Sequence, residues 1–181
     1  MRAALDRLYA SALALSAAAF AAIAVLVLIQ ILGRLADRIA RWIGAPPPGI
    51  TIPSLAEIGG FLFLAAVCLG LAGTFVGGGH VRVSLLTHAL PRRASRAVSM
   101  LIAALGGGLA AFATWSSWTQ ALDSWAFASV SYGMIRIPLW IPQGAMTLGL
   151  ALLCLALIDT LVVLARGGTP PVEHGETGGH A

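Results

Sequence analysis

Residues 8–32 read LYASALALSAAAFAAIAVLVLIQIL and contain no charged side chain. A helix of about 20 apolar residues is long enough to cross the hydrocarbon core of a bilayer. Three further uncharged apolar runs follow, at 58–76, 97–122 and 137–158. Because lipid offers the backbone no hydrogen-bond partners, each run is expected to be a helix. The chain is therefore predicted to be an all-α integral membrane protein with four transmembrane helices.

The composition leaves little room for a second domain. Of the 181 residues, 59% are hydrophobic and only 10% are charged, whereas soluble domains carry about a quarter charged residues. We predict a single membrane domain over 1–166, followed by a disordered cytoplasmic tail at 167–181 that is rich in Gly, Pro, Glu and His. The predicted spans are 8–32, 55–77, 97–122 and 138–164.

The eleven basic residues are all arginines, and they lie beside or between the apolar runs. This placement argues against a nucleic-acid-binding face and indicates a topological signal. With four spans, the larger group of arginines falls on the side that holds both termini. That group is Arg2, Arg7, Arg82, Arg92, Arg93, Arg96 and Arg166. The positive-inside rule then predicts that the N- and C-termini are cytoplasmic.

The segment 33–43 continues past the first span but changes character. Leu35, Ile39 and Trp42 fall on one helical face, and Arg34 falls with the other charged residues on another. This pattern is typical of a short amphipathic helix that lies along the membrane interface. We therefore predict such a helix after the first span, with its arginines toward lipid headgroups.

The sequence offers few groups for chemistry inside the membrane. Cys68 and Cys154 stand alone in apolar runs, the histidines lie in loops or the tail, and no charged residue is central in a span. Proton relays and coupled ion sites usually place ionisable groups at mid-depth. We therefore predict no catalytic, cofactor or metal site, and no enzyme.

Glu57, Asp123 and Asp159 are acidic residues near span ends. Glu57 follows Ser54 by three residues, which matches a capping box at the start of the second span. The alternative is an ion pair of Glu57 with Arg34, since an isolated carboxylate near a membrane is costly. Asp159 lies near the inner end of the fourth span.

The five tryptophans, Trp42, Trp115, Trp118, Trp125 and Trp140, all map to the outer half of the predicted topology. An aromatic belt at that interface is one interpretation. Three of them, Trp115, Trp118 and Trp125, also share one helical face. A contact with a partner subunit is the other interpretation of that face.

Residues 78–86 read GGHVRVSLL and are followed by Leu90 and Pro91. This stretch resembles the cytoplasmic loop signature of TRAP transporter small permease subunits, the DctQ-type family, which typically reads Gly-His-Ile/Val-Arg-Val-Asp-Leu-Leu. Ser84 stands where that family usually has the acid. The segment 137–142, IPLWIP, is similar to the family's entry into its fourth helix. The resemblance extends over the whole chain in the number and order of spans.

The resemblance implies a scaffold subunit of a tripartite uptake system in the bacterial inner membrane. A large permease would carry the sites for substrate and sodium. A periplasmic binding protein would deliver an organic acid such as a dicarboxylate, keto acid or sugar acid. Membrane lipids are the remaining partners. The candidate structural or interface residues are Arg34, Glu57, His80, Arg82, Trp115, Trp118, Trp125 and Asp159.

For the loop residues His80 and Arg82, two readings remain open. The first is a helix-ending loop with an inside-positive anchor, in which Arg82 pairs with Asp159 or with lipid phosphate. The second is docking to the inner surface of the large permease, as the resemblance implies.

Two other classes of protein remain as alternatives. An autonomous four-helix transporter acting as a homodimer would need a membrane-embedded carboxylate, and Glu57 is the one candidate. A membrane enzyme would need paired cysteines, embedded histidines or a nucleophile with its base, and the sequence displays none of these.

Overall fold

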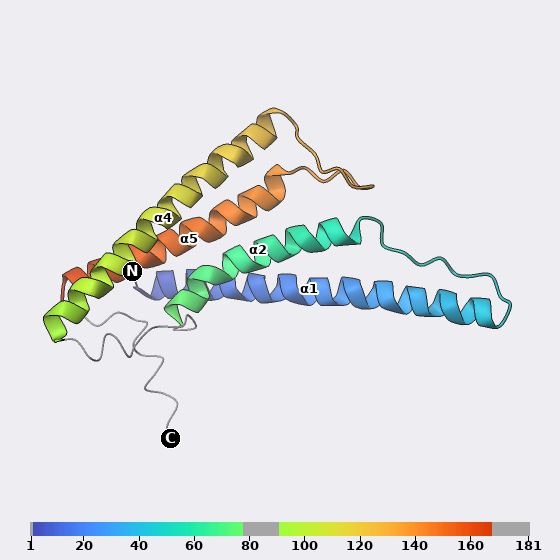
Figure 1. Cartoon of the computed structure of the whole chain (residues 1–181), viewed down its shortest axis with the longest axis horizontal. Helices are drawn as coiled ribbons and strands as arrows, with labels where there is room; N and C mark the ends of the chain where they lie inside the picture. The colour runs from blue at the N-terminus through green and yellow to red at the C-terminus, as the bar shows by residue number, and fades with distance from the viewer. Residues whose placement is uncertain (1, 78–90, 168–181) are drawn as a thin grey trace, which may run out of the picture.

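The structure is a computed structural model that describes residues 2–77 and 91–167 (Figure 1). In this part of the chain, four helices are long and apolar enough to cross a membrane, which confirms the predicted all-α membrane fold. The predicted tail from residue 168 and the loop 78–90 lie outside the described residues. The helices are α1 (Arg2–Trp42), α2 (Leu55–Val76), α4 (Arg92–Ala126) and α5 (Trp140–Ala165).

The four helices form a row in the spatial order α1, α2, α5, α4. Helix α2 packs against α1 and α5, and α4 packs against α5 (Figure 1). Helices α1 and α4 therefore lie at the two edges of the row. The ends connected by 43–54 and by 127–139 lie on the same side of the row, which we call the hairpin end.

The segment 33–43 differs from its prediction. It is helical to Trp42, but it continues α1 without interruption and is not a separate interfacial helix. The reason is that no helix breaker separates it from the span. Gly33 stays helical, and the carbonyl of Ile50 packs where a side chain at Gly33 would lie. The first break is Gly44, at a φ of 72° that favours glycine.

Small residues let α1, α2 and α5 approach closely. A Cβ placed on Gly149 of α5 would collide with the backbone carbonyl of Cys68 on α2. On the other side of α2, a Cβ on Gly70 would lie 2.9 Å from Ser16 Oγ of α1. The Ser16 hydroxyl donates a hydrogen bond to the carbonyl of Ala66 at 2.6 Å. In lipid, where apolar burial gives helices little reason to associate, such close packing holds them together.

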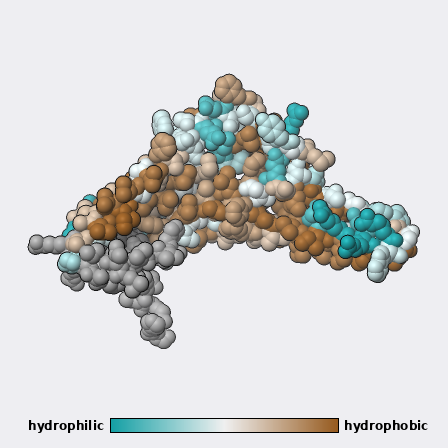
Figure 2. Space-filling model, viewed as in Figure 1, coloured by the Kyte–Doolittle hydropathy of each residue, from teal (hydrophilic) through white to brown (hydrophobic). Residues whose placement is uncertain are grey.

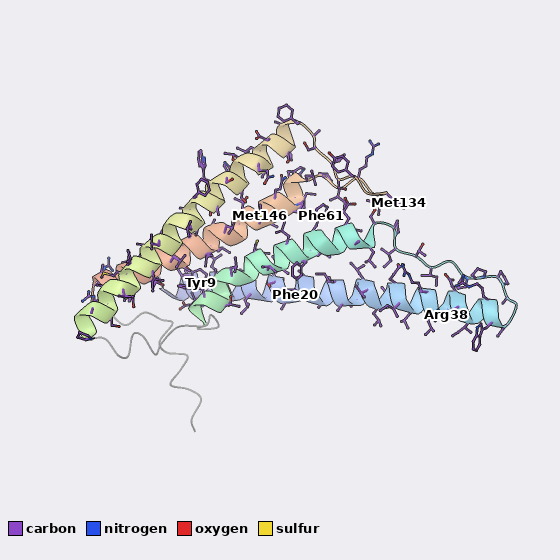
Figure 3. The ribbon with its side chains drawn as sticks, viewed as in Figure 1. Tyr9, Phe20, Arg38, Phe61, Met134 and Met146 are labelled. Carbon is purple, nitrogen blue, oxygen red and sulfur yellow. The ribbon has the colours of Figure 1, made fainter. Side chains whose placement is uncertain are left out.

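The three helices meet around Tyr9, near the N-terminal end of α1 (Figure 3). Tyr9 is 4% exposed and packs with Ala72 of α2 and Ala156 of α5. Among the described residues, its buried hydroxyl has no hydrogen-bond partner. Tyr9 thus lies where three of the four helices contribute to a common core.

Polar side chains join α4 to α5 at both ends of their contact. Near the N-terminus of α5, the Gln143 amide nitrogen, in the orientation that satisfies its neighbours, lies 2.7 Å from Ser124 Oγ and 3.2 Å from the Gln120 carbonyl. At the other end, Arg96 Nε donates to the Leu164 carbonyl at 2.8 Å. Arg96 therefore adds side-chain donors to the carbonyls of the last turn of α5, where the Leu164 carbonyl also accepts the Gly167 N–H.

We predict that Gly149→Ala destabilises the protein, because the added methyl group meets the backbone of α2 and not a flexible side chain. The expected loss is about 1–3 kcal/mol, as for other overpacked sites. The measurement is the midpoint of thermal unfolding in detergent. The matched control on the same helix is Gly144→Ala, whose Cβ meets nothing within 4 Å. Equal midpoints for the two variants would contradict the close contact.

Candidate partner interface

The segment 127–139 is held against the start of α2 by two polar side chains. The Gly133 N–H donates to Glu57 Oε1 at 3.3 Å, and the Ile135 N–H donates to Ser54 Oγ at 3.1 Å. Glu57 Oε2 is buried and has no hydrogen-bond partner within 2–77 and 91–167, and it occupies the space that a side chain at Gly133 would need. We call this arrangement the Glu57 clamp. It fixes the loop with Met134 over the start of α2 (Figure 3).

The capping box predicted for Ser54 and Glu57 is wrong. Ser54 has a left-handed backbone, with a φ of 55°, and its side chain makes no capping hydrogen bond. The Glu57 N–H instead bonds to the Ser54 carbonyl at 3.0 Å. The physical reason is competition: the loop between α4 and α5 offers two backbone N–H donors, and the two side chains turn toward them.

Arg34 lies apart from this clamp. It is exposed on α1 and lines a hollow together with other charged residues of that helix. No ion pair between Arg34 and Glu57 is formed in the described part of the chain. The carboxylate of Glu57 is used by the backbone of the loop instead.

Asp159 lies in the last third of α5 and is partly exposed. The candidates His80 and Arg82 lie outside the described residues. The predicted ion pair between Arg82 and Asp159 therefore stays a prediction. Among described residues, Arg96 is an arginine that bonds to α5, through the carbonyls of Leu164 and Ala165.

A shallow apolar groove of about 570 Å³ lies between α4 and α5. Trp115 and Trp118 form its α4 wall, and both are largely exposed, at 68% and 50%. Thr147 and Cys154 belong to its α5 wall. We call this feature the Trp groove. Its full lining is Ala111, Thr114, Trp115, Trp118, Thr147, Leu148, Ala151, Cys154, Leu155 and Ile158.

Trp125 is separated from this groove and pairs with Trp140 at the hairpin end. Their ring centroids lie 4.9 Å apart in an edge-to-face arrangement. Indole rings favour the interface between lipid and water, so the aromatic belt stays a prediction for this pair. Of the three tryptophans of α4, Trp115 and Trp118 line the groove, and Trp125 packs against Trp140.

Among the described residues, no group of three or more His, Cys, Asp or Glu side chains that could hold a metal occurs. What the structure presents is a set of packing surfaces: an open row, a groove lined by tryptophans and a loop fixed by a clamp.

Comparison with protein-family models identifies a family. Residues 23–167 match the model described as tripartite ATP-independent periplasmic transporters, DctQ component. The chain belongs to the DctQ family. No curated protein matches it. As a DctQ protein, the chain is a multi-pass membrane protein and a small permease component of a TRAP transporter.

Sequence reasoning missed several residues of this DctQ protein that the structure makes important. Gly133 and Tyr9 are not part of a recognisable motif, and their roles arise from contacts with residues far away in the sequence. For Gly133, the one local signal is a glycine in a short connection between two apolar runs, which indicates a turn without identifying its partner. Arg96 was counted only as a topological charge, although it caps α5.

We predict that Glu57→Ala frees the loop 127–139, whereas Glu57→Gln largely retains it. The amide oxygen of Gln can still accept the Gly133 N–H, and Ala cannot. The measurement is hydrogen–deuterium exchange of the peptide that covers this loop, and exchange should accelerate about tenfold in the Ala variant. Asp123→Ala, at an exposed position next to the loop, is the control. Unchanged exchange in the Glu57→Ala variant would contradict the clamp.

Proposed function

We propose that this DctQ protein is the static scaffold subunit of a sodium-driven TRAP transporter in the bacterial inner membrane. A large permease would carry the substrate, and a periplasmic binding protein would deliver an organic acid such as a dicarboxylate, keto acid or sugar acid. The supporting observation is the open row of helices. An edge helix such as α4 has one neighbour in the row, so most of its apolar surface remains available to a partner or to lipid.

The absence of central charge supports the scaffold role. The acidic residues that α2 and α5 contain are Glu57, in the first turn of α2, and Asp159, less than two turns from the end of α5. Glu57 Oε1 is already engaged by Gly133. A coupled transport site would place ionisable groups at mid-depth. The substrate and ion sites are therefore assigned to the large permease.

For the face that meets the large permease, we propose the Trp groove. Trp115 is ten residues from Trp125 along α4, which is about 15 Å of helix. If Trp125 and Trp140 mark the interface, Trp115 lies near the middle of a hydrocarbon core about 30 Å thick. An indole N–H in hydrocarbon has no acceptor, so a protein surface that supplies one is a better neighbour than lipid.

The orientation is inferred from charge. Arg7, Arg96 and Arg166 lie at the end of the row opposite the hairpin end, on the side with the larger group of arginines. The positive-inside rule places that end in the cytoplasm. The Glu57 clamp and the loop 127–139 would then face the periplasm, the side from which a binding protein approaches.

We predict that the protein alone transports nothing. In proteoliposomes, the isolated small subunit should show no uptake with or without a sodium gradient, because no coupled site is expected in its spans. Uptake should appear when the large permease and a substrate-loaded binding protein are added. Robust proton- or sodium-coupled transport by the isolated chain would instead support an autonomous homodimeric transporter.

We predict that replacing Trp115 and Trp118 together with Ala weakens assembly with the large permease by about tenfold or more, since buried Trp anchors dominate many interfaces. The measurement is the amount of permease that co-purifies with the small subunit. The matched control is Ile102→Ala with Leu109→Ala, because both residues are exposed on another face of α4. Equal recovery from both double variants would exclude the Trp groove as the docking face.

A further inference from the structure

Helix α1 projects past its neighbour at the hairpin end. The Ile52 N–H donates to Gln30 Oε1 at 2.8 Å, so the chain that enters α2 is level with Gln30. From Gln30 to the end of α1 at Trp42 is about 18 Å of helix. We call the projecting segment, residues 33–43, the α1 arm. Figure 1 shows it as the free end of α1, reached by the chain that returns to α2.

The α1 arm carries an apolar stripe that continues from the span. At 3.6 residues per turn, Leu35, Ile39 and Trp42 fall on the same face as Leu28 and Leu32 of the membrane segment. All five side chains are exposed, and Trp42 is 90% exposed. An apolar stripe of this length is unfavourable in water and requires a cover. Because the stripe is continuous, the lipid that covers the span is the natural cover for the arm.

Beside this stripe, the α1 arm presents a cationic face. Arg34, Arg38 and Arg41 lie within about 60° of one another around the helix, and Figure 2 shows the hydrophilic patch at this end of the molecule. Together with Ile31, Leu35 and Asp37, they line a hollow of about 440 Å³. No ion pair of these arginines is formed within the described residues.

The acid in the hollow is partly engaged elsewhere. Asp37 Oδ1 accepts a hydrogen bond from the Gly49 N–H at 2.9 Å, which ties the returning chain to the arm. The hollow is therefore lined by three guanidinium groups and one carboxylate. The carboxylate already accepts a backbone hydrogen bond. The hollow has a net positive charge and a surplus of hydrogen-bond donors.

We propose that the α1 arm lies in the headgroup layer of the bilayer and binds an anionic phospholipid, with its phosphate between Arg34, Arg38 and Arg41. Guanidinium groups bind phosphate through paired, charge-assisted hydrogen bonds. The acyl chains of the same lipid would cover Leu35 and Ile39. This site is independent of the proposed docking face, because it lies on the opposite edge of the row from α4.

Lipid fits this surface better than the acidic face of a soluble partner. A soluble protein would satisfy the arginines but would leave the stripe of Leu35, Ile39 and Trp42 in water. A basic helix with an adjacent apolar face and a terminal Trp is the pattern of interfacial helices on anionic membranes. A tilt of α1 within the range common for membrane helices would bring the arm toward the headgroups.

The experiment compares two triple variants of the full-length chain that remove equal charge. The first is Arg34→Gln, Arg38→Gln and Arg41→Gln. The control is Arg7→Gln, Arg136→Gln and Arg166→Gln, at exposed positions outside the α1 arm. Each protein is reconstituted in phosphatidylcholine with phosphatidylglycerol, extracted, and analysed by native mass spectrometry for the lipid it retains.

The wild type and the control should retain phosphatidylglycerol over phosphatidylcholine by about tenfold or more, and the arm variant should lose this preference. A second measurement covers the case in which the arm variant does not fold. A nitroxide label at position 39 of a chain that keeps the three arginines and has Cys68 and Cys154 replaced by Ala should be shielded from a water-soluble relaxation agent and accessible to oxygen.

Two outcomes would overturn the proposal. One is equal phosphatidylglycerol retention by the arm variant and the control, or no preference in the wild type. The other is a label at position 39 that is fully accessible from water. If the arm variant kept its lipid preference but no longer bound a periplasmic binding protein, the arginines would serve an acidic protein surface and not a lipid.

Discussion

The close contact between α2 and α5 is the constraint on which the rest of this DctQ protein depends. Lipid tails are as apolar as the helices they surround, so helices in a membrane associate mainly through close packing. The backbone of Cys68 fits against α5 because Gly149 has no side chain. Helix α1 packs on α2, and α4 packs on α5, so this contact joins the two halves of the row.

A row of helices has different consequences from a closed bundle. A closed bundle hides one face of every helix and can enclose a site, whereas here α1 and α4 each pack along a single neighbour. The large side chains on these edge helices are therefore mostly exposed, and few positions approach full burial. The family match makes this open row a small permease component of a TRAP transporter, and the scaffold role is our proposal for it.

The connections at the hairpin end are held by side chains that accept backbone N–H groups. Glu57 and Ser54 hold the loop 127–139, and Gln30 and Asp37 hold the chain between α1 and α2. A loop near a membrane surface cannot leave its donors unpaired without cost. These four polar residues therefore determine the shape of the surface that the protein presents at this end.

The sequence by itself determined the membrane class, the four helices and the family, because long uncharged runs and the loop pattern at 78–86 are local features. Tertiary structure decided the rest. The amphipathic period at 33–43 could not distinguish a flat helix from the continuation of α1, since both have the same pattern. Likewise, Ser54 and Glu57 match a capping box, but backbone donors 81 and 76 residues further along the chain bond to them instead. Local spacing cannot reveal a partner that only the packing of α4 and α5 brings into reach.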